Sequence, residues 1–210
     1  MNDYLFRYDW FTNNIPTWKE HLVCYAGAED ITFVEIGCWE GRSAVWLLEN
    51  ILLKPSCRLH CIDPWASPNG EVIEDRFNYN TRLVSNITSA QLIKHKDRSI
   101  DILPSFSGES VDVVYVDGSH IAKDVLSDIL LSWRIIKQSG ILICDDYELD
   151  QEIQFHDGYE TYSVAPPLHR PRMAIDAFLQ CFDGHYRLLH KGWQVLLRKC
   201  DLSVPDSRHG

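Results

Sequence analysis

Residues 33–43, Phe-Val-Glu-Ile-Gly-Cys-Trp-Glu-Gly-Arg-Ser, decide the fold of this 210-residue chain. A hydrophobic run leads to Glu35, then Gly37 and Gly41 open a turn, and Ser43 begins an amphipathic stretch. This succession predicts a strand, a tight turn and a helix N-terminus, where backbone amides can meet a small ligand. The spacing differs from the Gly-x-Gly-x-x-Gly of dinucleotide-binding folds, so we expect a different nucleoside-bearing ligand.

Short apolar runs alternate with segments of helical period along most of the chain. The runs are typical of buried parallel strands and lie at residues 31–36, 57–62, 91–93, 111–116 and 140–144. The helical segments lie at residues 43–53, 100–106, 121–136 and 173–182, and residues 186–190 and 193–198 predict a hairpin. In the 121–136 helix, Val125 and Ile129 fall near one face, and Asp124 and Asp128 on another. We therefore expect an α/β fold with a doubly wound, mostly parallel seven-stranded sheet, helices on both faces and an antiparallel C-terminal hairpin.

Composition favours one domain over residues 1–200, followed by a disordered tail at 201–210. Thirty acidic against twenty basic side chains give a formal charge of −10, which opposes binding to nucleic acid or to an anionic membrane. The seven cysteines form no Cys-x-x-Cys pair and are expected to be buried free thiols in a reducing compartment. No signal peptide or bilayer-spanning run is found, which predicts a cytoplasmic protein.

Acidic residues follow four of the predicted strands, and these strand ends meet at one edge of an open parallel sheet. They are Glu35, Asp63, Asp117 and the pair Asp145 and Asp146. Helix capping is the alternative explanation for any single one of them. Ligand binding at that edge is the interpretation that accounts for all four strand ends together.

Asp63 can accept two hydrogen bonds from a ribose diol, with Trp65 covering an adenine face. The competing interpretation is that Asp63 and Pro64 only form a turn. Ser99 either caps a helix or contacts an adenine edge, and the sequence leaves both open.

Asp117, Asp145 and Asp146 follow two strands that we expect to be neighbours about 4.8 Å apart. Oxygen ligands without histidine or thiolate favour Mg²⁺, with Mn²⁺ and Ca²⁺ as alternative ions. Capping of a turn and of the following helix by these residues is the alternative to a metal site. His120, three residues after Asp117, is a candidate base near neutral pH or else a solvent-exposed residue of a helix first turn.

Four segments, residues 34–43, 62–65, 116–120 and 140–147, together resemble class I S-adenosylmethionine-dependent methyltransferases, whose fold is Rossmann-like. More narrowly, they are similar to the small metal-dependent group with the macrocin and aminocoumarin sugar O-methyltransferases, and more distantly to catechol O-methyltransferase. The resemblance implies a cofactor site at Glu35, Gly37, Gly41, Ser43, Asp63, Trp65, Ser99 and Asp117. It implies metal ligands at Asp117, Asp145 and Asp146, and catalytic roles for His120 and Asp117.

The expected function is metal-assisted methylation of a small-molecule hydroxyl on a sugar, a catechol or another natural product, using S-adenosylmethionine and Mg²⁺. The acceptor is expected to meet residues 66–80 and 148–171, with residues 147–171 as a substrate-side loop and residues 1–30 as an N-terminal helical lid. The relatives also imply a homodimer or a larger homo-oligomer. Two alternatives are a nicotinamide-dependent oxidoreductase and a non-catalytic nucleoside-binding protein of the same fold.

Overall fold

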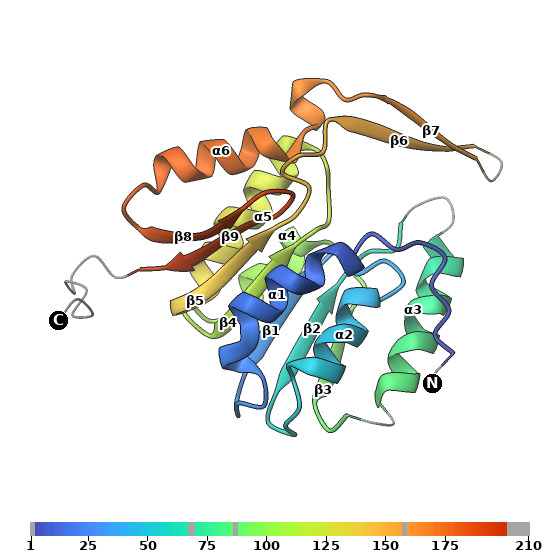
Figure 1. The fold of residues 1–210 in the computed structure, drawn as a ribbon, viewed down its shortest axis with the longest axis vertical. Coiled ribbons are helices and arrows are strands. Elements are labelled where there is room, and N and C mark those ends of the chain that lie inside the picture. The colour runs from blue at the N-terminus through green and yellow to red at the C-terminus, as the bar shows by residue number, and fades with distance from the viewer. Residues whose placement is uncertain (1–2, 67–69, 86–87, 157–158, 201–210) are drawn as a thin grey trace.

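The computed structural model describes residues 3–66, 70–85, 88–156 and 159–200 and contains a seven-stranded sheet in the order β3-β2-β1-β4-β5-β9-β8 (Figure 1). Its strands are β1 (Thr32–Ile36), β2 (Arg58–Ile62), β3 (Gln91–His95), β4 (Val111–Val116), β5 (Ile136–Cys144), β8 (Tyr186–Lys191) and β9 (Val195–Lys199). The first five pair with one another in parallel, and β9 pairs antiparallel with both β5 and β8. The fold class expected from the sequence is confirmed.

Helices cover both faces of this sheet, as Figure 1 shows. One face carries α1 (Ile15–Leu22), α2 (Arg42–Asn50) and α3 (Gly70–Ser85), and the other carries α4 (Ser99–Ile102), α5 (Ala122–Ile135) and α6 (Pro171–Cys181). Short 3-10 helices lie at Thr12–Asn14, Val23–Tyr25, Leu103–Ser105 and Pro167–His169. None of the described helices is long and apolar enough to cross a lipid bilayer.

Two hydrophobic cores result because strand side chains alternate between the faces. In β1, Phe33 packs with the α1–α3 side, whereas Val34 and Ile36 pack with the α5–α6 side. In β4, the ring of Tyr115 packs edge to face against Trp18 of α1, with 4.9 Å between the ring centroids. Burial on both faces explains why the strands appear as continuous apolar runs in the sequence.

The structure also departs from the sequence analysis in several places. Helix α3 begins inside the stretch expected to bind substrate, and β6 (Gln151–His156) pairs with β7 (Tyr159–Val164) within residues 147–171. The β8–β9 turn comprises residues 192–194, so β9 starts later than expected. Cys24 and Cys181 are exposed, which corrects the expectation that all cysteines are buried. The 201–210 tail lies outside the described residues.

Candidate functional site

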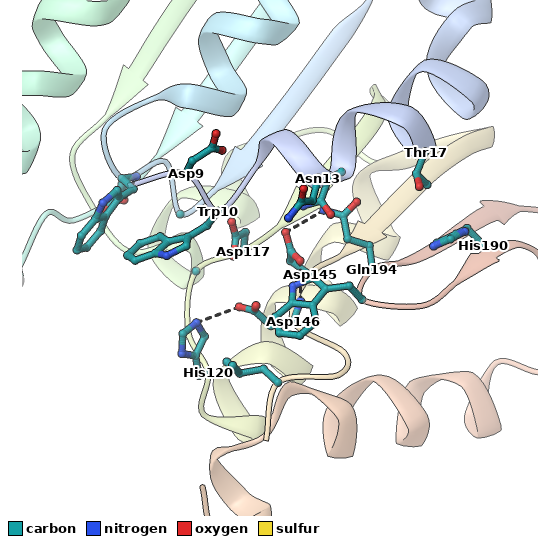
Figure 2. A pocket seen from close by; sticks show the side chains of 17 residues that line it. Asp9, Trp10, Asn13, Thr17, Asp117, His120, Asp145, Asp146, His190 and Gln194 are labelled. Carbon is teal, nitrogen blue, oxygen red and sulfur yellow. Dashed lines mark hydrogen bonds and ion pairs between the residues drawn. The ribbon is translucent and has the colours of Figure 1, made fainter. Parts of the chain in front are cut away.

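Two adjoining cavities lie at the carboxyl ends of the parallel strands, with volumes of about 650 Å³ and 340 Å³. Gly37, Trp39, Asp63 and Gly118 line both. Figure 2 shows the larger cavity, with Asp117, Asp145 and Asp146 from the strand ends facing side chains from the N-terminal segment and the C-terminal hairpin. An elongated ligand with two chemically different ends fits this arrangement.

Gly37 allows the β1–α2 turn to pack directly on the end of β4. Its φ angle is +81°, and a Cβ atom there would lie 2.0 Å from the carbonyl oxygen of Asp117. The Gly37 N–H donates to the carbonyl of Ile62 at the end of β2 (2.9 Å). A side chain at position 37 would therefore separate strands whose ends form the site.

Asp63 holds the same turn from the end of β2. Its carboxylate accepts hydrogen bonds from the backbone N–H groups of Cys38 (2.9 Å), Trp39 (3.1 Å) and Trp65 (2.7 Å). Burial raises the pKa of Asp63, while these hydrogen bonds act in the opposite direction. A carboxylate has about four acceptor positions, so one stays open, and Asp63 lines both cavities.

Glu35 lies behind the turn and lines neither cavity. The Ser43 hydroxyl donates to Glu35, and burial raises the pKa of this carboxyl to about 8. Ser43 and Gly41 also lie outside the described lining of both cavities. Glu35, Gly41 and Ser43 therefore support the β1–α2 turn and do not face either cavity.

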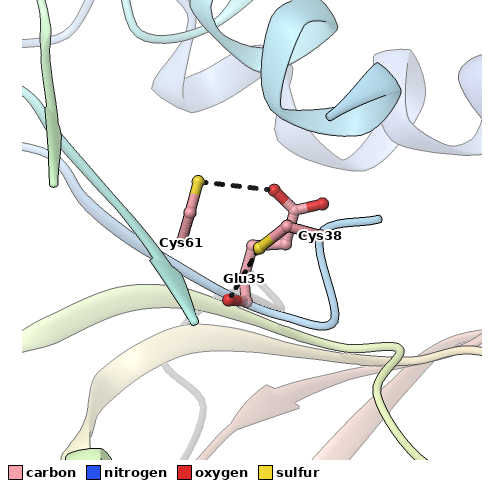
Figure 3. A group of neighbouring side chains, drawn as sticks. All are labelled: Glu35, Cys38 and Cys61. Atoms are coloured by element: carbon pink, nitrogen blue, oxygen red, sulfur yellow. Dashed lines mark hydrogen bonds between the residues drawn. The ribbon is translucent and has the colours of Figure 1, made fainter. Parts of the chain in front are cut away.

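Glu35 also belongs to a buried group with Cys38 and Cys61 (Figure 3). Among the described residues, only these three His, Cys, Asp or Glu side chains have ligand atoms all within 4.8 Å of one another. Burial raises the pKa of both thiols, and protonated thiols are poor metal ligands. The group is best explained as neutral packing beneath the turn.

The smaller cavity has apolar walls and a polar edge. Trp65, Ile62 and Ile36 are among the apolar residues that line it. Ser99 lies at the polar edge, where its hydroxyl donates to Asp128 (2.5 Å). The other polar residues of its lining are Asp63, Arg98, Ser119, Asp124 and Asp128. Apolar walls with a polar edge suit a flat heterocycle that carries hydrogen-bonding groups.

The acidic strand ends meet in the larger cavity, because β4 and β5 are neighbours. The Tyr115 hydroxyl lies within hydrogen-bonding distance of both Asp117 (2.8 Å) and Asp145. Burial, followed by the charges of Asp145 and Asp146, raises the pKa of Asp117 well above its usual range. Burial and the charge of Asp146 raise the pKa of Asp145 to about 7. Asp117 and Asp145 are thus adjacent, with Tyr115 contacting both.

Gln194 is a site residue that the sequence analysis missed. Its amide donates to Asp145 (2.8 Å) and accepts from the Trp18 indole (2.8 Å), so α1 and the C-terminal hairpin fix this carboxylate. In the sequence it lies within a run expected to be a strand, and no local signal marks it.

His120 contacts Asp146 through Nε2 at 3.0 Å (Figure 2). Burial alone would lower the pKa of His120, but the hydrogen bond to Asp146 and the charges of Asp146 and Asp145 raise it. The His120 side chain is 47 % exposed, so its ring is accessible from the cavity.

The remaining wall of the larger cavity comes mainly from the chain termini. The N-terminal segment contributes Asp9, Trp10, Asn13, Asn14 and Thr17, and the C-terminal hairpin contributes His190, Trp193 and Gln194. From residues 148–171, only Leu149 is among the described lining, and the side chains of residues 152–162 lie outside the description. Asn14 Nδ2 and Trp39 Nε1 are buried donors without a partner in the described structure. A ligand in this cavity therefore meets residues that the sequence analysis did not name.

Comparison with known proteins is consistent with this geometry. The model of the methyltransferase domain family matches residues 34–147. An uncharacterized protein of Acanthamoeba polyphaga mimivirus is 26% identical over 131 residues, which cover 61% of this chain and 57% of that protein. The chain thus spans little more than half the length of that relative.

Solved structures share the fold at low identity. A protein from Corynebacterium glutamicum has a TM-score of 0.62 at 15% identity, and the match covers 96% of this chain and 84% of the Corynebacterium chain. MycE is a methyltransferase of the mycinamycin biosynthetic pathway, solved with Mg, S-adenosylhomocysteine and mycinamycin VI. It has a TM-score of 0.59 at 13% identity, and the match covers 96% of this chain and 53% of the MycE chain. Other neighbours include an rRNA methylase and an N1-methyltransferase, so the fold does not identify the methyl acceptor.

Proposed function

The chain belongs to the methyltransferase domain family and is a class I S-adenosylmethionine-dependent methyltransferase. We propose that it methylates a hydroxyl group of a small molecule with the help of Mg²⁺. The observation that supports this proposal most strongly is the pair of joined cavities. An apolar cavity suited to a heterocycle opens past Asp63 into one lined by Asp117, Asp145, Asp146 and His120. The family match gives no support to the alternative of a nicotinamide-dependent oxidoreductase.

In this proposal S-adenosylmethionine supplies an electrophilic methyl group. Adenine would occupy the smaller cavity between Trp65 and the Ile36 and Ile62 side chains, with the ribose at Asp63. Because Asp63 already accepts three hydrogen bonds from turn N–H groups, it has one acceptor position left for a ribose hydroxyl. Accepting from both ribose hydroxyls would require one of the turn N–H groups to change its partner. Gly37 and Gly118 would border the methionine part at the junction of the cavities.

Asp117, Asp145 and Asp146 would hold the cation, because three carboxylates lining one cavity are a donor set that suits Mg²⁺. Their oxygens do not all lie within 4.8 Å of one another in the described structure, so these side chains would have to draw together around the ion. When bound, a divalent cation lowers the pKa of a coordinated hydroxyl and orients it. Tyr115 and Gln194 would position these carboxylates through their hydrogen bonds to Asp145.

His120 is the proposed base. Because Nε2 faces Asp146, the other ring nitrogen, Nδ1, is the atom that would accept the proton of the acceptor hydroxyl. Asp146 would orient the ring and stabilise the imidazolium that forms. The chain's other task is to align the hydroxyl oxygen with the methyl group.

The charge of the larger cavity favours a small acceptor over nucleic acid. Asp9, Asp63, Asp117, Asp145 and Asp146 are among its described lining residues, which include no lysine or arginine. With a net charge of −10 on the whole chain, this lining would repel a phosphate backbone.

Calorimetry with S-adenosylhomocysteine, followed by a methyl-transfer screen of sugar, catechol and other hydroxylated acceptors with and without Mg²⁺, tests the proposal. We expect binding to the wild type and transfer that EDTA abolishes. Absence of S-adenosylhomocysteine binding would refute the proposed function.

Asp145→Asn tests the cation separately. We expect it to weaken Mg²⁺ binding to the S-adenosylhomocysteine complex at least tenfold in calorimetry, while Asp9→Asn, which changes an exposed residue of the same cavity, has little effect. Unchanged Mg²⁺ binding in Asp145→Asn would remove the metal from the proposal and leave the methyl transfer.

A further inference from the structure

Asp128 is a buried carboxylate that the proposed reaction does not use. It lies within α5 and is 5 % exposed, so it belongs to the buried side of the helix rather than to the polar face expected from the sequence. It is also one of the residues that line the smaller cavity. Burying a carboxylate is costly unless hydrogen bonds compensate, so the partners of Asp128 need an explanation.

One oxygen of Asp128 has a clear structural role. Oδ1 accepts a hydrogen bond from the Ser99 hydroxyl (2.5 Å), which connects α5 to the first turn of α4. This is the only hydrogen bond found for Asp128 within the described chain. Oδ2 lies on the side of Gly118, where an added Cβ would be 3.8 Å away, and Gly118 lines both cavities. The second oxygen thus stays available at the polar edge of the smaller cavity.

The other polar groups beside Asp128 on this edge are already engaged or can only donate. Ser99 uses its single hydroxyl proton on Asp128. Asp124, one helical turn earlier, accepts from Lys123 (2.9 Å) with one oxygen and from Ser119 (3.3 Å) with the other. Arg98 also lines this cavity, and its guanidinium has no acceptor to offer. Asp63 accepts three backbone hydrogen bonds and is assigned to the ribose, so a donor group on the base finds its free acceptor at Asp128.

We propose that Asp128 is the residue that selects adenine, by accepting a hydrogen bond from the exocyclic amino group of the base. This inference rests on the proposed function, in which the base occupies the smaller cavity. The apolar side chains of Trp65, Ile36 and Ile62 recognise a flat ring without distinguishing one purine from another. Asp128 adds that distinction, because hypoxanthine carries an oxygen acceptor where adenine carries a donor amine, and two acceptors repel.

The test compares S-adenosylhomocysteine with S-inosylhomocysteine, its deaminated analogue, by calorimetry on the full chain. We expect the wild type to bind the adenine form at least 30-fold more tightly. Asp128→Asn should lower this ratio at least tenfold, because an asparagine amide can donate to the hypoxanthine oxygen and its carbonyl still accepts from Ser99. Asp124→Asn, which removes the same charge from the same cavity, should leave the ratio within threefold of the wild type.

The outcomes separate this inference from the proposed function. If the wild type binds neither compound, the proposed function fails. If the wild type binds S-adenosylhomocysteine but does not prefer it to the inosine form, the role of Asp128 is refuted without any variant. An unchanged ratio in Asp128→Asn, or an equal loss of ratio in Asp124→Asn, refutes it as well.

Discussion

At the scale of single residues, Glu35 shows how a polar group can serve the site without touching the ligand. Its carboxyl lies fully buried beneath the β1–α2 turn and accepts a hydrogen bond from Ser43, with the Cys61 thiol 3.9 Å from its second oxygen. Because burial raises its pKa to about 8 from an ordinary value of 4.5, the protein folds most favourably with this carboxyl protonated. The position of Glu35 at a strand end suggested ligand contact, but the side chain alternates toward α2 instead.

Glu35 makes the stability of the fold depend on pH. The folded state binds the Glu35 proton more tightly than the unfolded state, so this contribution is fully present below about pH 4.5 and is lost as the pH rises toward 8. Glu35→Gln keeps the shape and an acceptor for Ser43, and we expect its stability relative to wild type to increase by roughly 3–4 kcal/mol between pH 5 and pH 8. Urea unfolding at several pH values measures this difference. Parallel pH profiles for wild type and Glu35→Gln would contradict it, and the exposed Glu29→Gln serves as the control that should follow wild type.

At the scale of elements, α3 holds the N-terminal segment in place against the turn. Asn80 accepts from the Leu5 N–H (2.7 Å) and donates to the carbonyls of Leu5 (3.1 Å) and Glu40 (2.8 Å). Glu40 in turn accepts from the Arg7 N–H (2.6 Å) and pairs with Arg76 of α3 (2.5 Å). The segment then continues to Asp9 and Trp10, which line the larger cavity.

Asn80→Ala should release this segment. The three lost hydrogen bonds predict a destabilisation of about 2–3 kcal/mol and faster hydrogen exchange in residues 4–10, detected by mass spectrometry. Asn78→Ala is the matched control, since Asn78 is exposed on the same helix and contacts Lys94 instead. Protection of residues 4–10 that equals the wild type in Asn80→Ala would show that other contacts hold the segment.

The elements also show how far the sequence could be interpreted. Strands such as β1 and β4 were predictable because burial on both faces makes them continuously apolar. The turn at Gly37 was predictable from its glycines, and the acidic ends of β2, β4 and β5 were predictable because carboxylates follow several buried strands in succession. The roles of Asn80, Gln194 and Asp128 were not predictable from the sequence. Each role depends on a partner far away in the chain or on which face of a helix is covered, and such long-range contacts leave no local sequence pattern.

At the scale of the whole molecule, the larger cavity is assembled from nearly the full length of the chain. Trp10 comes from the N-terminal segment, Asp117 and Asp145 follow central strands, and Trp193 lies in the final hairpin turn. The β6–β7 sheet is different, because its strands pair with each other and join neither edge of the seven-stranded sheet. In Figure 1 it extends away from the body of the molecule.

This arrangement predicts that the β6–β7 hairpin can be removed without loss of the cofactor site. The Ala165 N–H donates to the Asp150 carbonyl (2.8 Å), so the hairpin begins and ends at adjacent points, and a short Gly-Ser link can replace residues 151–164. We expect S-adenosylhomocysteine affinity within twofold of the wild type by calorimetry and a melting temperature within a few degrees, because the described cofactor-side lining lies outside the hairpin. If the deletion weakened cofactor binding tenfold or more while the circular dichroism spectrum of the remaining fold persisted, the hairpin would belong to the cofactor site. A loss confined to methyl transfer would instead assign it to the acceptor.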